Sequence, residues 1–191
     1  MSSVDNSFSV LQIAHKCLAE IVHEGDFCID ATAGRGNDTA FLAELCGRNG
    51  RVAAFDIQRD AVESTRSLLA SKGLDADVYL DSHSNMDKYG FAKGSVTAIT
   101  FNFGWLPCGN HSISTHADTS LEALDKSLEL LKPGGVVSLC IYYGRDTGFA
   151  ERDAILDYLD KLDNKKYTAI VNRFVNRPNC PPISAFIFKG V

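Results

Sequence analysis

Short apolar runs alternate with helical patterns along nearly the whole chain, from about residue 26 onward. This alternation is typical of a mostly parallel sheet whose strands are joined by helices on both faces. We therefore predict an α/β fold with seven strands, the last of them antiparallel, and about six helices. The strands are expected at residues 27–29, 51–55, 77–80, 96–101, 136–141, 167–174 and 183–188.

The helices are predicted from apolar residues that recur three or four positions apart. One such pattern, at residues 8–23, precedes the first strand and ends before Gly25. A later helix has a start signal, because Thr119 and Glu122 fit a capping box, and a stop signal in the Pro and Gly residues of the segment 132–135. The other helices are expected to begin at residue 38 or 39 and to cover residues 59–72 and about 149–163.

The size and composition of the chain favour one domain. A length of 191 residues suits a single sheet with its helices, so we expect one domain over residues 1–191, with residues 1–24 as an N-terminal helical segment. No apolar run approaches the roughly 20 residues that cross a membrane. Residues 1–6 contain no Lys or Arg of a signal peptide, so we expect a cytoplasmic protein. The six cysteines include no C-x-x-C pair, and Cys108 with His111 supplies too few ligands for zinc, so we expect reduced cysteines and no metal.

The strongest chemical signal is the segment from Asp30 to Thr39, which lies between a predicted strand and a predicted helix. Gly34 and Gly36 allow the backbone to turn sharply and to approach a ligand closely. An acidic residue, Asp56, ends the next strand 20 residues beyond Gly36. A carboxylate at that place can accept hydrogen bonds from both hydroxyls of a ribose. The pattern therefore predicts a cofactor that contains a nucleoside.

Two features of this segment favour a cofactor with a positively charged end. Thr39 stands where a dinucleotide-binding loop has its third glycine, and Asp30 and Asp38 flank the turn, where they would repel a pyrophosphate. Carboxylates suit the ammonium and sulfonium groups of S-adenosylmethionine. The alternative is structural, with Asp38 as a helix cap and Asp30 as an ordinary residue at the strand end.

Two further segments follow predicted strands and would lie at the same edge of the sheet. Ser82 and His83 could hydrogen-bond an adenine, although such residues are also common in loops. Asn102 could orient an amine through its carbonyl oxygen. Trp105, three residues later, could stack on a planar base or serve as a core or lid aromatic. The long segment 103–118 also contains His111, His116 and Asp118, and no general base is assigned among them.

Taken together, these motifs resemble one family of proteins. The matching segments are Asp-Ala-Thr-x-Gly-x-Gly-Asn-Asp-Thr at 30–39, Phe-Asp-Ile-Gln at 55–58, Ser-His at 82–83, Asn-Phe-Gly-Trp-Leu-Pro at 102–107 and Asn-Cys-Pro-Pro at 179–182. They are similar to the small rRNA methylase family of class I S-adenosylmethionine-dependent methyltransferases, which implies a Rossmann-like fold. Members of that family are assigned as methyltransferases of 5-(aminomethyl)-2-thiouridine at the wobble position of tRNA.

The resemblance also implies roles for individual residues. It places an acceptor site around residues 102–107 and cofactor contacts at Arg35, Asp38, Asp56, Gln58, Ser82 and His83. The chain departs from the family pattern where Arg145 follows Gly144 in place of His, and where Cys108-Gly109-Asn110 stands in place of Gly-Gly-Asp. We expect catalytic positions at Asn102 and Trp105. The full cofactor site is expected to comprise Asp30, Thr32, Gly34, Arg35, Gly36, Asn37, Asp38, Thr39, Asp56, Ile57, Gln58, Ser82, His83 and Asn102.

The residues and the resemblance together favour N-methylation of the 5-aminomethyl group of a wobble uridine in tRNA. A net charge of −5 disfavours RNA binding by overall charge, so such an enzyme would grip only an anticodon loop. A homodimer with two-fold symmetry would double that footprint. A local basic rim is expected from Lys88, Lys93, Arg145, Arg173 and Arg177.

Three alternatives stay open on the sequence. The acceptor of the methyl group could be rRNA or a small molecule instead of tRNA. The chain could be an NAD-dependent oxidoreductase, against which Thr39 and the paired acids argue. It could also be a non-enzymatic nucleotide-binding module, which would bind the cofactor without turnover.

Overall fold

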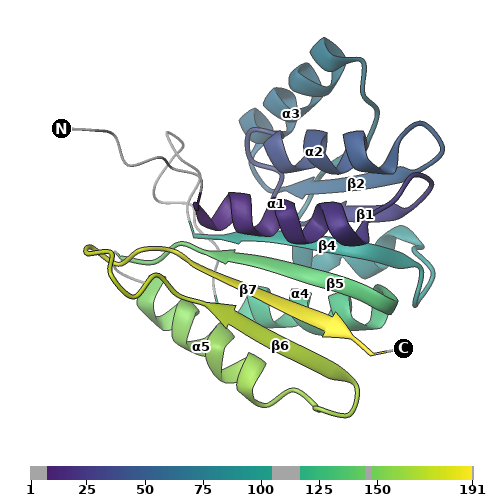
Figure 1. Ribbon diagram of the computed structural model, residues 1–191. Coiled ribbons are helices and arrows are strands. Elements are labelled where there is room, and N and C mark those ends of the chain that lie inside the picture. Colours follow the sequence, from purple (N-terminus) through teal and green to yellow (C-terminus); the bar gives the residue numbers. More distant parts are fainter. Residues whose placement is uncertain (1–7, 105–116, 145–147, 191) are drawn as a thin grey trace.

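The computed structural model describes residues 8–104, 117–144 and 148–190. These residues form a seven-stranded sheet with the strand order β3-β2-β1-β4-β5-β7-β6 (Figure 1). Neighbouring strands are parallel, except that β7 runs antiparallel to both β5 and β6. The strands are β1 (Phe27–Asp30), β2 (Arg51–Asp56), β3 (Asp77–Leu80), β4 (Val96–Phe103), β5 (Leu131–Ile141), β6 (Tyr167–Asn172) and β7 (Ile183–Lys189).

Helices cover both faces of this sheet. Three helices, α1, α2 and α3, contribute side chains to one core cluster, while η1, α4 and α5 contribute to the other. The helices are α1 (Val10–Ile21), α2 (Asn37–Cys46), α3 (Arg59–Lys72), α4 (Ala117–Leu130) and α5 (Gly148–Asp160), and η1 (His83–Tyr89) is a 3₁₀ helix.

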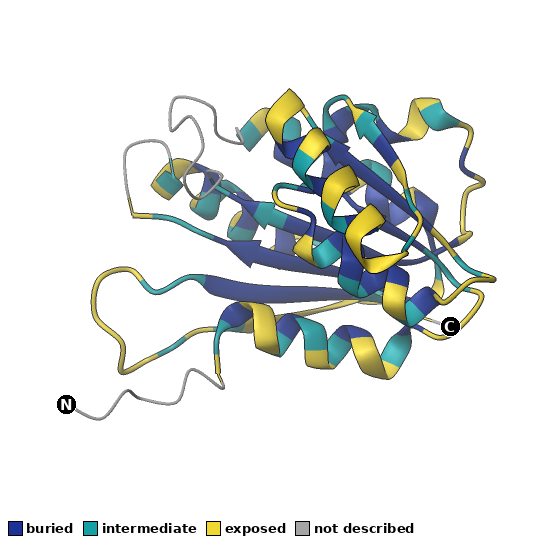
Figure 2. Cartoon of the chain, turned by 90° about the horizontal axis from the view of Figure 1, so that it is seen from above, coloured by how far each residue is buried: buried dark blue, intermediate teal, exposed yellow. Residues whose placement is uncertain are grey.

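Alternating strand residues divide the core between these two layers. In β1, Cys28 packs with α1–α3, whereas Ile29 packs with α4 and α5. Val136 and Val137 of β5 are divided in the same way. Successive side chains of a strand point to opposite faces, so a strand covered on both sides reads as a continuous apolar run. Figure 2 shows the result, with buried strands in the centre and helices exposed on their outer sides.

The predicted fold class is confirmed. The sheet has seven strands, is mostly parallel and becomes antiparallel near its C-terminal end, with helices on both faces. None of the helices described here is long and apolar enough to cross a membrane. Within the same residues, no group of three or more His, Cys, Asp or Glu side chains could hold a metal ion.

Two predicted helix starts are wrong. The helix α4 begins at Ala117, so Thr119 lies inside it and does not cap it. Glu122, the other half of the predicted capping box, forms an ion pair with Lys126 at 2.8 Å. The helix α2 begins at Asn37, ahead of the predicted position 38 or 39, with Gly36 as its N-cap. A short sequence signature is satisfied by many segments, and only the backbone around it decides whether it caps a helix.

The structure also differs from the prediction at the start of β5, at the start of α1 and in the segment of η1. The strand β5 begins earlier than predicted, because Leu131 pairs with Val96 across an irregularity that precedes the regular pairing. The helix α1 begins with a capping box that was not predicted, formed by Ser9 and Gln12. The 3₁₀ helix η1 occupies a segment to which no helix or strand was assigned from the sequence.

Candidate functional site

The sheet reverses its strand order between β1 and β4, which lie side by side although β2 and β3 come between them in the sequence. In open α/β sheets, ligands bind outside the carboxyl ends of the strands at such a point. Asp30 ends β1, Asp56 ends β2, and Asn102 lies near the end of β4. The fold therefore brings the predicted polar residues to one edge of the sheet.

Asp30 organises the loop after β1 from within the protein. Its side chain is fully buried. One carboxylate oxygen accepts a hydrogen bond from the Thr39 hydroxyl at 2.6 Å, and the other accepts one from the backbone N–H of Thr32 at 3.2 Å. Burial, with the negative charge of Asp38 nearby, raises the pKa of Asp30 above the ordinary range of aspartate. Asp30 thus joins β1 to the first turn of α2.

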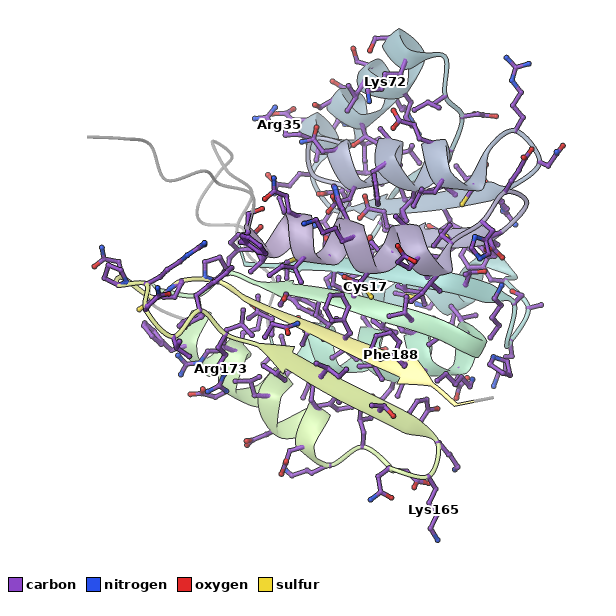
Figure 3. The ribbon with its side chains drawn as sticks, viewed as in Figure 1. Cys17, Arg35, Lys72, Lys165, Arg173 and Phe188 are labelled. Atoms are coloured by element: carbon purple, nitrogen blue, oxygen red, sulfur yellow. The ribbon has the colours of Figure 1, made fainter. Side chains whose placement is uncertain are left out.

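The loop between Asp30 and α2 depends on a glycine at residue 36. Gly36 has a φ of +84°, and a Cβ atom there would lie 2.8 Å from the Cα of Thr65 in α3. A side chain would therefore be strained by its backbone conformation and would also collide with α3. Arg35 and Asn37, on either side of this glycine, are exposed at the edge of the sheet (Figure 3 labels Arg35). The close approach of two backbones holds the loop in place.

Asp56 presents a carboxylate that the backbone holds in position. One of its oxygens accepts a hydrogen bond from Gly34 N–H at 2.9 Å, and the other accepts one from Gln58 N–H at 2.9 Å. Burial raises the pKa of Asp56. Each carboxylate oxygen can accept more than one hydrogen bond, so this side chain keeps acceptor sites for a ligand. The neighbouring Ile57 is exposed, and Gln58 is the N-cap residue of α3.

Asp38 does not act as the cap of α2. The N-cap is Gly36, and no side chain caps the helix, so the structural alternative for Asp38 is wrong. Its carboxylate instead accepts hydrogen bonds from His15 Nε2 at 2.7 Å and from Asn102 Nδ2 at 2.6 Å. The His15 ring, in α1, stacks on Phe41 with a centroid separation of 3.9 Å. His15 was not predicted, because its contact with Asp38 spans 23 residues and nothing in its spacing indicates it.

Asn102 is held at both its backbone and its side chain. Its N–H donates to the Thr32 hydroxyl at 2.6 Å, while its side-chain amide donates to Asp38. Because Nδ2 faces Asp38, the carbonyl oxygen Oδ1 is directed away from that carboxylate and can accept a hydrogen bond from a ligand. The rest of the predicted acceptor site, residues 105–107 with Trp105, lies outside the described residues, and so do Cys108, His111, His116 and Arg145.

Ser82 and His83 lie after β3 in different environments. The Ser82 hydroxyl caps η1 and accepts a hydrogen bond from the backbone N–H of Ser84 at 3.2 Å. The His83 ring is 8% exposed and packs edge-on against Phe101 and Phe103. Burial lowers the pKa of His83 to about 4, so its ring is neutral at physiological pH. Its Nε2 atom is buried and has no hydrogen-bond partner among the residues that the structure describes.

The predicted residues thus fall into three groups at one edge of the sheet. The first group is linked by hydrogen bonds across β1, α2 and β4, and it contains Asp30, Thr32, Asp38, Thr39 and Asn102. His15, which was not predicted, adds to this group through its contact with Asp38. The second group connects the glycine loop with the end of β2 through Gly34, Asp56 and Gln58. The third group is Ser82 and His83. Arg35, Asn37 and Ile57 are exposed beside these groups.

Comparison with known proteins identifies similar chains. A family model described as "Putative rRNA methylase" matches residues 52–188. A curated protein of Arabidopsis thaliana, the chloroplastic tRNA (mnm(5)s(2)U34)-methyltransferase, is 36% identical in an alignment of 188 residues that covers 93% of this chain and 68% of that protein. A solved structure of a "putative rRNA-methylase" from Clostridium thermocellum is 44% identical, with a TM-score of 0.92 over 98% of this chain and 100% of the other. A "putative methyltransferase" from Streptococcus mutans, solved in complex with SAH, is 34% identical, with a TM-score of 0.87 over 95% of this chain and 98% of the other.

Proposed function

The chain belongs to the family described as "Putative rRNA methylase", and from this premise we propose that it N-methylates the 5-aminomethyl group of the wobble uridine in tRNA. It is a methyltransferase of the class I fold, and its methyl donor is S-adenosylmethionine. Two findings support the finer proposal. The Arabidopsis relative is named for this position of tRNA. Within the site, the 2.6 Å hydrogen bond from Asn102 to Asp38 leaves an amide oxygen available for an amine, and this observation carries the proposal.

The described residues fit a cofactor that joins a nucleoside to a positively charged amino-acid end. Asp56 is fixed by two backbone N–H groups and keeps acceptor sites for ribose hydroxyls. Asp38 supplies a negative charge beside the glycine loop, which suits an ammonium group. The buried Nε2 of His83 has no partner within the described part of the chain, and a ligand could supply one. We assign Asp30, which is fully buried, a positioning role behind this loop.

The chain contributes mainly by positioning the acceptor. S-adenosylmethionine, when bound, supplies an electrophilic methyl group on its sulfonium. Asn102 Oδ1 accepts a hydrogen bond from the acceptor amine and directs its lone pair, and the contact with Asp38 prevents the amide from turning over. Such orientation can lower a barrier by about 7–11 kcal/mol in well-aligned systems. The amine must be unprotonated to attack, so its proton leaves to water or to a neighbouring group before or during transfer.

The test is methyl transfer from labelled S-adenosylmethionine to bulk tRNA from cells that lack methylation of the wobble aminomethyl group. Nucleoside mass spectrometry then identifies the product. We expect a methylated 5-aminomethyl uridine, and we expect ribonuclease treatment before the assay to abolish the transfer. Label on rRNA alone, or on a small molecule after ribonuclease treatment, would contradict the tRNA assignment. Cofactor binding without any transfer would contradict the enzymatic assignment.

A further inference from the structure

The connection between β6 and β7 leaves the sheet at the same edge as the candidate site. β7 is antiparallel to both β5 and β6, so β5 and β6 run in the same direction and their carboxyl ends share that edge. The connection, residues 173–182, follows Asn172 at the end of β6. It also approaches the segment after β5, because a Cβ atom at Gly144 would lie 3.6 Å from the Cβ of Cys180. We call residues 173–182 the β6–β7 loop.

This loop carries positive charge without acidic neighbours in its own sequence. Its residues, Arg-Phe-Val-Asn-Arg-Pro-Asn-Cys-Pro-Pro, include two arginines and no acid, in a chain whose net charge is −5. Both arginines are exposed, and within the described residues neither forms an ion pair. By contrast, Arg51, Arg152 and Lys126 are all paired with carboxylates. The loop therefore offers two uncompensated guanidinium groups beside the site.

One of these guanidinium groups is held by an aromatic ring. The guanidinium carbon of Arg177 lies 3.7 Å from the centre of the Phe174 ring. Stacking of this kind restricts a long side chain and leaves the edges of the guanidinium free to donate hydrogen bonds. Arg173 stands at the end of the loop that joins β6, where Figure 3 labels it. The two arginines thus lie in the first half of the loop, on the side that joins β6.

The backbone of the loop is held in a conformation that L-residues rarely adopt. Asn179 has a φ of +62° and Cys180 a φ of +51°, and they are the two non-glycine residues with positive φ in the part of the chain that the structure describes. Pro181 and Pro182 follow directly and restrict the chain further. Residues in such conformations persist only where the surroundings determine them, and they cluster at ligand-binding segments. The loop extends beyond the buried strands and is mostly exposed (Figure 2), while its positive φ angles and its prolines constrain its backbone.

We propose that the β6–β7 loop is the surface that grips the phosphate backbone of the RNA substrate, with Arg173 and Arg177 each binding phosphate oxygens. The proposal rests on the proposed function only in taking RNA as the substrate. A guanidinium matches phosphate in charge and in its paired donors. Phosphate contacts position a nucleic acid without reading its sequence, and the loop lies where it would place an RNA against the edge that carries Asn102.

The chemistry of the loop favours RNA over a protein partner. Protein interfaces have a buried apolar centre. In the loop, Val175 is the only exposed large apolar residue, with 96% of its surface accessible, and Phe174 is covered by Arg177. The remaining exposed side chains are arginine, asparagine, proline and the single cysteine Cys180. A polyanion such as RNA can form ion pairs with both arginines, whereas an apolar surface of a protein partner could bury only one isolated valine.

The test compares two double variants of the full-length protein that remove the same charge. One is Arg173→Gln with Arg177→Gln, in the β6–β7 loop. The control is Lys161→Gln with Lys165→Gln, two exposed lysines between α5 and β6 at the opposite edge, where Figure 3 labels Lys165. Binding of fluorescent tRNA in the presence of S-adenosylmethionine is titrated by anisotropy at several salt concentrations. Calorimetry measures the affinity for S-adenosylmethionine alone.

We expect the arginine variant to bind tRNA at least about tenfold more weakly and to lower the slope of log affinity against log salt by about 1.5. Its affinity for S-adenosylmethionine should stay within about twofold of the wild type, and the lysine control should change neither value. The single variant Arg177→Lys keeps the charge but loses the paired donors, so its tRNA affinity should fall between that of the wild type and that of the arginine double variant.

The outcomes separate this inference from the proposed function. If tRNA is methylated and the arginine variant binds it as well as the wild type does, the inference is overturned and the function stands. If tRNA binding depends on the arginines but no methyl group is transferred, the proposed function is overturned and the inference stands. An equal loss in the lysine control, or a changed oligomeric state with unchanged tRNA affinity, would also overturn the inference, the latter in favour of a protein interface.

Discussion

At the β1–β2 side of the site, hydrogen bonds from the protein hold the carboxylates, whereas the arginines at the β6–β7 side form no ion pair with the described residues. Asp30, Asp38 and Asp56 each accept at least two hydrogen bonds from the surrounding protein. Arg173 and Arg177 form no ion pair with the described residues, and their loop contains two backbone conformations that are strained for non-glycine residues. We call the β1–β2 side the organised side, because its carboxylates are already held in place by the protein. We call the β6–β7 side the open side, because its positive charges are not neutralised by the described residues.

This difference matches the two ligands that we propose for the two sides, S-adenosylmethionine and RNA. A small cofactor needs a few groups held at defined distances, and preorganised groups lose little freedom when it binds. An RNA presents a repeated charge along a flexible backbone, for which long cationic side chains on an exposed loop are suited. The predictions below test whether the organised side binds through groups that are held in place, and whether the protein leaves the β6–β7 loop in a strained conformation.

The largest effect is expected where the two sides meet, at Asn102. Asn102→Ala should lower turnover by about 100-fold, because the acceptor amine loses the group that orients it. Affinity for S-adenosylmethionine should change much less. Steady-state kinetics and calorimetry provide the two values, with Asn49→Ala, an exposed asparagine bonded to Glu24, as the matched control. Equal losses in turnover and cofactor affinity would place Asn102 on the cofactor instead of the acceptor.

The next effect tests the organised side directly. Asp56→Ala should weaken binding of S-adenosylmethionine by about 1.5–3 kcal/mol, the contribution of hydrogen bonds to a charged group. As a control, Asp60→Ala removes an exposed carboxylate four residues away, in the first turn of α3, and should leave the affinity unchanged. Calorimetric titration measures both variants. An unchanged affinity in Asp56→Ala would remove this residue from the ribose site, whatever its contacts with Gly34 and Gln58.

Much of the organised side could be predicted because its signals are local in the sequence. Gly34, Gly36 and the acid that ends β2 follow from strand, turn and helix patterns within a single unit of the fold. The seven strands followed from apolar runs for the same reason. The contact of His15 with Asp38 could not be predicted in this way, because it depends on how α1 packs over α2.

The open side was harder to predict for a physical reason. No glycine indicates the positive φ of Asn179 and Cys180, so the constrained conformation of the loop is visible only in the structure. Arg173 and Arg177 were expected in a basic rim, but their exposure and their missing ion pairs depend on which side chains fold near them. The same limit produced the wrong capping box at Thr119, since a local signature does not show where the helix begins.

A smaller effect should appear at His83, which follows β3 and whose Nε2 has no hydrogen-bond partner among the described residues. Its pKa is lowered from 6.5 to about 4, so the unfolded chain binds a proton more readily than the folded protein between those values. Stability therefore rises with pH through that window. Between pH 7.5 and pH 5 this residue should remove about 2 kcal/mol from the free energy of unfolding. Urea unfolding of the wild type and of His83→Gln at both pH values isolates the contribution of His83 to this change in the free energy of unfolding. If both proteins lose the same free energy between pH 7.5 and pH 5, His83 takes up its proton in the folded protein as readily as in the unfolded chain.

The smallest effect tests whether the β6–β7 loop is strained. Cys180→Gly should raise the free energy of unfolding by up to about 1 kcal/mol, because glycine adopts positive φ without steric cost, although part of the gain is offset by its greater freedom in the unfolded chain. Asn179→Gly is the matched control and should gain less, since asparagine tolerates the left-handed conformation better than cysteine does. Denaturant unfolding resolves both differences. If Cys180→Gly is less stable than the wild type, the contact between Cys180 and the segment around Gly144 holds the loop more strongly than its backbone strains it, and the open side is then more organised than the comparison states.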